Sequence, residues 1–268
     1  MGQIIELPDS LKLKQEIGEL KSRLENLVLE RDELQFVVCE NVKMKYMLEI
    51  GSLEYKVYKT YCEFLRLRRK KEILQAKKNR QETFNMAEVD HILDEEFLNY
   101  KKKLEEKIHE MNQALERSKM KLLSKEETAE LKKLYRSIVK SLHPDLNPNC
   151  SDAEKDLFYN ATEAYKQGDL GTLQIIFQMS ETEENKEEAS SSLIKLQKEK
   201  QRFQRLVSMV EAQIEEIKTK PPYIWKIYFE DERKKAERIA ELEKQQKSFQ
   251  EAIRTQQERI NELMGNEK

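Results

Sequence analysis

Long apolar stripes with a helical period constrain this chain more than any other feature. In the first of them the steps alternate four and three, through Leu13, Ile17, Leu20, Leu24, Leu27, Leu34 and Val38. That spacing places the apolar side chains on one face of a helix of the coiled-coil type. Only 6 glycines and 5 prolines occur among 268 residues, so few turns can interrupt such helices. The chain is therefore predicted to be all-α, with long helical hairpins or coiled coils flanking a small helical module.

Changes in composition divide the chain into four stretches. These are an N-terminal helical hairpin or coiled-coil region (1–122), a small helical module (123–180), an acidic linker (181–192) and a C-terminal helical hairpin or coiled coil (193–268). The linker has almost no apolar content, which predicts a solvated segment. Pro221 and Pro222 cannot continue a helix, so the last stretch is expected to hold two helices around a proline turn. An antiparallel hairpin and a parallel homodimer both remain open there.

The N-terminal region is expected to contain three helices. Asn41 is a candidate break after the first, and the second is expected over 46–80. A turn at 79–85 precedes the third, which is capped by Asn85 and runs to about residue 121. The sequence thus predicts an antiparallel hairpin in this region.

Opposite charges lie on either side of that turn. The basic run "RLRRKK" occupies 66–71, and the acidic residues past the turn are Glu88, Asp90, Asp94, Glu95 and Glu96. A hairpin would set the two runs side by side, so we interpret the basic run as one arm of an ion-paired hairpin. RNA or an acidic lipid surface is the less favoured ligand for it.

Local signals in residues 124–179 predict short helices. Two capping boxes, a terminating glycine and a capping aspartate mark their ends: Ser124 with Glu127, Ser151 with Glu154, Gly168 and Asp169. The first of these helices should end at His143, because Pro144 disfavours helical dihedrals at the residue before it. His143, Pro144 and Asp145 are then expected to be presented at an exposed joint. Lys132, Lys133, Arg136 and Lys140 recur on one polar face of the same helix.

This stretch resembles the J-domain of DnaJ-type co-chaperones. The matching features are the His-Pro-Asp tripeptide at 143–145, the Tyr135-Arg136 pair ahead of it, the basic stripe, and Phe158, Ala161, Ala164 and Tyr165 in the next helix. The wider arrangement is similar to bacterial coiled-coil J-domain proteins. J-domains stimulate ATP hydrolysis by DnaK-type heat-shock chaperones. The resemblance implies that chaperone binding is carried by His143, Pro144, Asp145, Lys132, Lys133, Arg136 and Lys140.

The sequence also departs from the family's pattern. The short first helix of the family is absent, and the end of the preceding helix, with Leu122 and Leu123, is expected to replace its packing contacts. Leu146 stands where the family usually has a lysine.

A catalytic or metal site and a structural scaffold are the other functions to consider. Cys150 lies near His143 in the sequence, but a nucleophilic or metal site needs further groups that the pattern does not supply. No enzyme activity and no cofactor are therefore expected. The alternative function is a structural coiled-coil scaffold with an inactive J-like module.

Net charge and cysteine content bear on which partners and which cellular location are expected. The net charge of −2 gives no field that would attract nucleic acid or an anionic membrane, and no apolar run is long enough to span one. Three unpaired cysteines without a CxxC motif favour a reducing, cytoplasmic setting. The resemblance to J-domains implies a DnaK-type chaperone and an unidentified client protein as partners.

Overall fold

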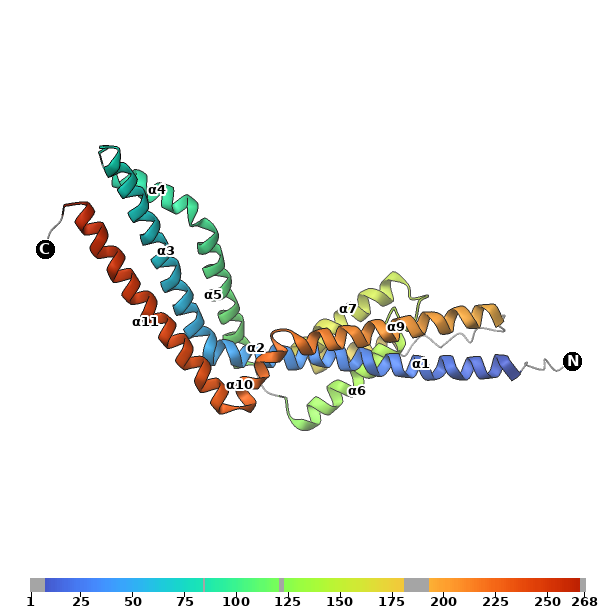
Figure 1. Ribbon diagram of the computed structural model, residues 1–268. Helices are drawn as coiled ribbons and strands as arrows, with labels where there is room; N and C mark the ends of the chain where they lie inside the picture. Colours follow the sequence, from blue (N-terminus) through green and yellow to red (C-terminus); the bar gives the residue numbers. More distant parts are fainter. Residues whose placement is uncertain (1–7, 84, 121–122, 181–192, 266–268) are drawn as a thin grey trace, which may run out of the picture. The chain divides into compact units, whose positions relative to one another are not determined.

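The computed structural model describes residues 8–83, 85–120, 123–180 and 193–265, and all their regular secondary structure is helical (Figure 1). The all-α prediction is confirmed. None of the described helices combines the length and the apolar character needed to cross a membrane. Contacts divide the chain into two compact units, each built from two separate stretches of sequence. The first unit contains Met1–Asn41 with Lys121–Ile224, and the second contains Val42–Met120 with Trp225–Lys268.

The expected helix break at Asn41 is wrong. Helical structure continues through it as α1 (Pro8–Asp32), η1 (Glu33–Val38), α2 (Cys39–Tyr46), η2 (Met47–Gly51) and α3 (Ser52–Asn79). Here η1 and η2 are π-helical segments, in which the wider turn shifts the phase of the residues that follow. The apolar stripe loses its regular period at these points. In the sequence alone, such a phase shift resembles the end of a helix.

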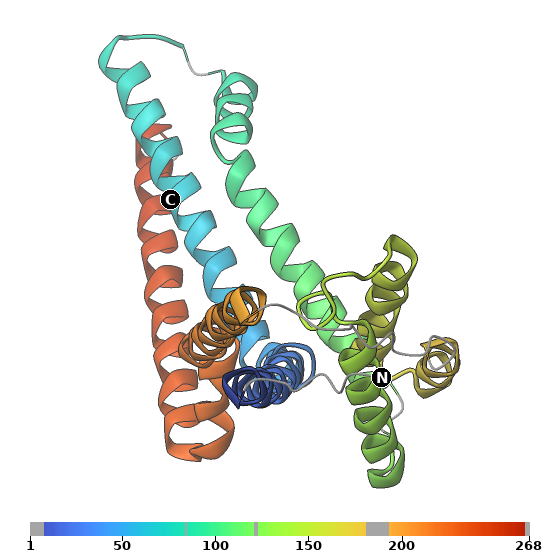
Figure 2. The same ribbon diagram turned by 90° about the vertical axis from the view of Figure 1, so that its right-hand side faces the viewer.

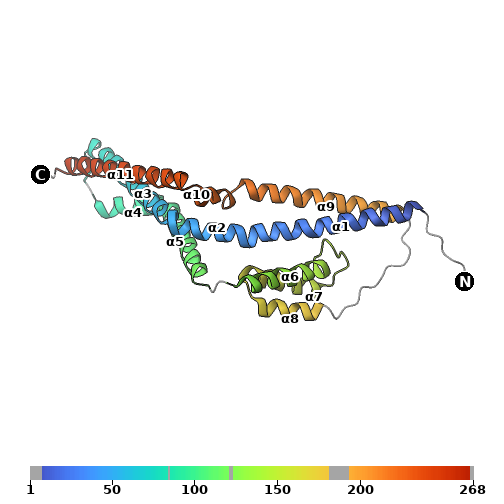
Figure 3. The same ribbon diagram turned by 90° about the horizontal axis from the view of Figure 1, so that it is seen from below.

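In the first unit, α1 lies along α9 (Leu193–Thr219) over most of its length (Figure 3). The pair is parallel, because contacts advance together in both helices: Glu16 with Lys200, Arg23 with Glu211 and Glu30 with Lys218. The buried seam contains Ile17, Leu24, Val28, Leu196, Phe203, Val207, Val210 and Ile214. The apolar stripes predicted for both helices therefore face a common core.

A hairpin within residues 193–268 is not the pairing that forms. The partner of α9 is α1, and the partner of α11 (Glu232–Leu263) is α3 in the second unit. A heptad stripe specifies one apolar face but not which of several similar faces it meets, so the nearest helix in sequence need not be the partner.

The small module of the first unit consists of α6 (Lys125–Leu142), α7 (Asp152–Gln167) and α8 (Leu170–Ser180), which pack on one another. Both predicted capping boxes are confirmed, and Gly168 ends α7 in the left-handed conformation, with φ of 70°. Tyr135 of α6 stacks on Tyr165 of α7 with ring centroids 4.1 Å apart. Leu123 packs against this core, while Leu122 lies outside the described residues. The preceding helix ends at Lys119, so the expectation that its end supplies these contacts is wrong.

The second unit contains the predicted charge-paired hairpin. The expected helix over 86–121 divides at Phe97 into α4 (Met86–Glu96) and α5 (Leu98–Lys119), and both pack on α3. The ion pairs between α3 and α4 are Arg66–Asp94, Arg69–Glu96, Lys70–Asp90 and Lys77–Glu88. Figure 2 shows α3 (cyan) beside α11 (red) in this unit. The basic run at 66–71 is thus engaged with its acidic counterpart, as the sequence predicts.

Candidate functional site

The His-Pro-Asp turn between α6 and α7 is closed by hydrogen bonds that converge on His143. The backbone N–H groups of Leu146 and Asn147 donate to the His143 carbonyl at 3.0 and 2.9 Å. The Asp145 N–H donates to Nδ1 of the His143 ring at 3.1 Å. The side-chain amide of Asn147 donates to the Lys140 carbonyl at 3.0 Å, which satisfies one of the last acceptors of α6. These bonds fix the turn as one rigid joint.

His143 is buried, and the expectation that it is presented to solvent is wrong. Only 6% of the residue is exposed, and the edge of its ring meets Phe158 of α7 with centroids 5.0 Å apart. Burial lowers the pKa of His143 below its ordinary value, against the opposing effect of Asp145. Since Nδ1 accepts a hydrogen bond, the ring is neutral and holds the turn from inside.

Pro144 and Asp145 are the parts of the turn that reach the surface, and both are partly exposed. The Asp145 carboxylate makes no hydrogen bond or ion pair within the part of the chain that the structure describes, so it is free to meet a partner's cation. The tripeptide therefore divides into an internal anchor and an outward-facing carboxylate.

Leu146 is a core residue. It is 2% exposed and belongs to the same apolar cluster as Ile138 and Leu142 of α6. A lysine at this position would have to remove its ammonium group from water, which is costly without a partner. The leucine at this position is thus part of the core.

The four basic residues predicted for the site lie on the exposed side of α6, but the structure places them in two situations. Lys132 pairs with Glu33 of η1, and Arg136 contacts Glu25 and Asn26 of α1. The side chains of Lys132 and Arg136 remain 46% and 56% exposed. Lys133 and Lys140 are exposed and have no side-chain hydrogen bond or ion pair among the described residues.

A buried polar network behind this face was missed by the sequence reasoning. Tyr135 Oη donates to Asp32 Oδ2 at 2.8 Å, and both residues are 1% exposed. Arg31 donates to Asp32 Oδ1 through Nε at 2.9 Å and Nη2 at 2.7 Å, and its Nη1 reaches Gln213 Oε1 at 3.4 Å. Burial and the neighbouring Asp32 carboxylate raise the pKa of Tyr135. The network runs from α9 through α1 to α6; adjacent charges at 31 and 32 inside an apolar stripe were its only sequence signal.

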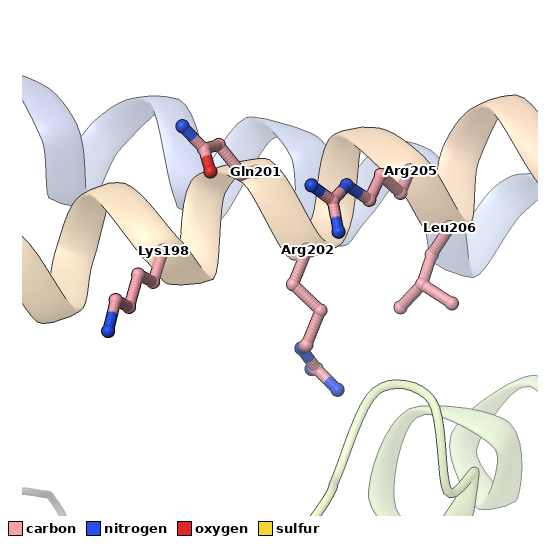
Figure 4. Close-up of a pocket in the computed structure, with 5 residues that line it drawn as sticks. All are labelled: Lys198, Gln201, Arg202, Arg205 and Leu206. Carbon is pink, nitrogen blue, oxygen red and sulfur yellow. The ribbon is translucent and has the colours of Figure 1, made fainter.

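A cationic residue of α9 also contacts the turn. Arg202 extends from α9 toward the turn, and its Nη2 donates to the Asp145 carbonyl at 3.1 Å (Figure 4). Arg202 lines a shallow hollow of about 370 Å³ together with Lys198, Gln201, Arg205 and Leu206. The partly exposed surface around Asp145 is thus bordered by positive charge from α9 as well as from α6.

The geometry gives little support to a cysteine–histidine pair. Cys150 Sγ donates to the Leu142 carbonyl at 3.6 Å, and His143 Nδ1 accepts from the backbone of Asp145. Both groups are therefore engaged with the backbone of the turn. Across the described ranges, no three histidine, cysteine, aspartate or glutamate side chains gather as a metal site would require.

Comparison with known proteins identifies no family. No protein-family model, curated protein or solved structure matches the chain.

Proposed function

We propose that this protein is a J-domain co-chaperone that binds a DnaK-type heat-shock chaperone and stimulates its ATPase. The α6 face and the His-Pro-Asp turn contact the chaperone, while the long helices recruit a client or partner protein. The protein itself performs no chemistry in this proposal, and the interaction takes place in the cytoplasm. The observation that carries the proposal is the turn, whose tripeptide is held rigidly at the end of a helix with a cationic face.

Rigidity of the turn supports docking. Pro144 fixes one backbone dihedral, and the bonds to His143 restrain the residues on either side, so little conformational entropy is lost on binding. The partly exposed Asp145 carboxylate can accept a bidentate hydrogen bond from an arginine of the partner.

Charge on α6 supports recognition of an acidic partner. Lys133 and Lys140 are exposed on α6, the helix that ends at the turn, and can attract an acidic surface. Such steering acts mainly on the association rate and weakens as salt is added. We therefore expect the interaction to be strongest at low ionic strength.

The test is single-turnover ATP hydrolysis by a DnaK-type chaperone, with and without this protein. We expect faster hydrolysis with the wild type and loss of that stimulation with His143→Gln, because the ring that anchors the turn is removed. His91→Gln is the matched control, since it makes the same substitution at an exposed position of α4. Absence of stimulation, or equal stimulation by wild type and His143→Gln, contradicts the proposal.

A structural scaffold with an inactive J-like module is the second candidate. The observation that favours it is the pairing of Lys132 and Arg136 with acidic residues of the same chain. This candidate predicts that Asp145→Asn leaves both assembly and cellular function unchanged. The co-chaperone proposal predicts that the same variant assembles normally but loses cellular function.

A further inference from the structure

The predicted chaperone-docking face is held by the chain's own long helices. We call α1, η1 and α9 together the arm. Lys132 pairs with Glu33 of the arm, and Arg136 contacts Glu25. Arg202 of the arm donates to the Asp145 carbonyl at 3.1 Å. Two of the four predicted docking cations and the turn itself are therefore in contact with the arm.

The groups that the arm presents are of the kind expected on the partner. An acidic chaperone surface would offer carboxylates to Lys132 and Arg136, and Glu25 and Glu33 already supply them. Pairing within the chain neutralises the charge that would attract the partner. The same cation cannot keep its internal carboxylate and also form a close pair with an external one.

Different contacts of the arm have different strengths. The ion pairs to Lys132 and Arg136 are half-exposed, so each contributes little and can exchange. The Tyr135–Asp32 bond is buried and involves a charged acceptor, which makes it stronger than the two half-exposed ion pairs. The outer pairs can therefore release while the inner bond still keeps the module in place.

We propose that the arm is an autoinhibitory clamp, in which Glu25 and Glu33 occupy the α6 cations and must release them before a DnaK-type chaperone can dock fully. This inference rests on the proposed function and adds its regulation. Lys133 and Lys140, which the clamp leaves unpaired within the described residues, form the first contact, and the chaperone then displaces the two glutamates. A client that binds the arm would favour the released form.

Opening variants test the clamp. Glu25→Lys with Glu33→Lys places like charges opposite Arg136 and Lys132 and leaves every predicted docking residue intact. Since apparent affinity scales with the fraction of competent molecules, the half-maximal chaperone concentration should fall about tenfold. The matched control is Glu19→Lys with Glu40→Lys, which makes the same charge change at positions of this unit whose carboxylates form no ion pair with α6 among the described residues.

A direct contact assay completes the experiment on the full chain. A carbodiimide couples amines to adjacent carboxylates, so the wild type should give a Lys132–Glu33 cross-link detectable by mass spectrometry. Its yield should fall when an ATP-loaded DnaK-type chaperone is added. Absence of the cross-link, or a yield that the chaperone leaves unchanged, overturns the clamp.

The stimulation assay separates the two proposals. Equal, non-zero stimulation by wild type and opening variant overturns the clamp and leaves the co-chaperone function standing. No stimulation by either protein, with the cross-link present, overturns the co-chaperone function and the inhibitory role together. Stronger stimulation by the opening variant than by both wild type and control is the result that the clamp predicts.

Discussion

The buried bond between Tyr135 and Asp32 makes a quantitative prediction about the attachment of the module. In Tyr135→Phe the ring and its stacking on Tyr165 are retained, and only the hydroxyl that donates to Asp32 Oδ2 is lost. A hydrogen bond to a charged group contributes about 1.5–3 kcal/mol, and both partners here are 1% exposed. We therefore expect the module to lose about 2 kcal/mol of stability.

Hydrogen exchange measures this loss where it occurs. Since every 1.4 kcal/mol is a factor of ten, amides of α6 should exchange roughly 30-fold faster in Tyr135→Phe than in the wild type. Amides of α11, which belongs to the second unit, serve as an internal reference and should be unchanged. Tyr159→Phe is the matched control, because Tyr159 is 65% exposed on α7 and its substitution should cost less than about 0.5 kcal/mol.

A double-mutant cycle assigns the effect to the pair. Asp32→Asn and Tyr135→Phe should together cost less than the sum of their separate effects, with a coupling of about 1–2 kcal/mol. Exchange rates in Tyr135→Phe that match those of Tyr159→Phe, or a coupling near zero, would refute the claim that this bond holds the module.

Three further substitutions test the burial of His143, Leu146 and Gln256. In the unfolded chain His143 takes up a proton near pH 6.5, whereas burial lowers its pKa in the folded chain. The unfolded state therefore binds more protons as the pH drops from 7 toward 5, and the stability of the fold should decrease over that range. Urea midpoints at both pH values should show this dependence in the wild type and a weaker one in His143→Gln. Leu146→Lys should cost at least about 2 kcal/mol in urea unfolding, since it buries an ammonium at a position that is 2% exposed; a neutral effect would contradict the burial. Gln256→Met should stabilise the second unit by about 1 kcal/mol in thermal unfolding, because no described residue hydrogen-bonds to the buried Oε1 of Gln256; a loss of stability would contradict this.

Features set by neighbouring residues could be predicted from the sequence. The capping boxes at Ser124 and Ser151, the glycine end at Gly168 and the helix end at His143 each depend on a few adjacent positions. The ion-paired hairpin between α3 and α4 was predictable for the same reason, because a short turn brings its two charged runs together.

Long-range pairing could not be predicted in this way. The stripes of α1, α3, α9 and α11 have similar periods. The side-chain hydrogen bonds between α1 and α9 join residues that are 182 to 188 positions apart, as in Arg31–Gln213 and Lys218–Glu30. A seam of leucine, isoleucine and valine fits several partners almost equally well. The choice depends on the packing of the whole unit, which no local pattern contains.

In the candidate site, too, local features were predictable and long-range contacts were not. The residues of the turn and the basic face were found from the sequence, whereas the burial of His143 and the contacts from Asp32 and Arg202 were not. These depend on the arm, whose residues lie far from the turn in sequence. The structure therefore changes the expected site from an exposed tripeptide into a turn that is anchored from within and bordered by the arm.

Association of the intact protein with a DnaK-type chaperone tests the proposed function most directly. Binding should be measured by biolayer interferometry with ATP and with ADP, for the wild type, His143→Gln and the control His91→Gln. We expect binding that requires ATP, is lost in His143→Gln and is retained in His91→Gln. Binding that is equal for all three proteins, or no binding with either nucleotide, would contradict it.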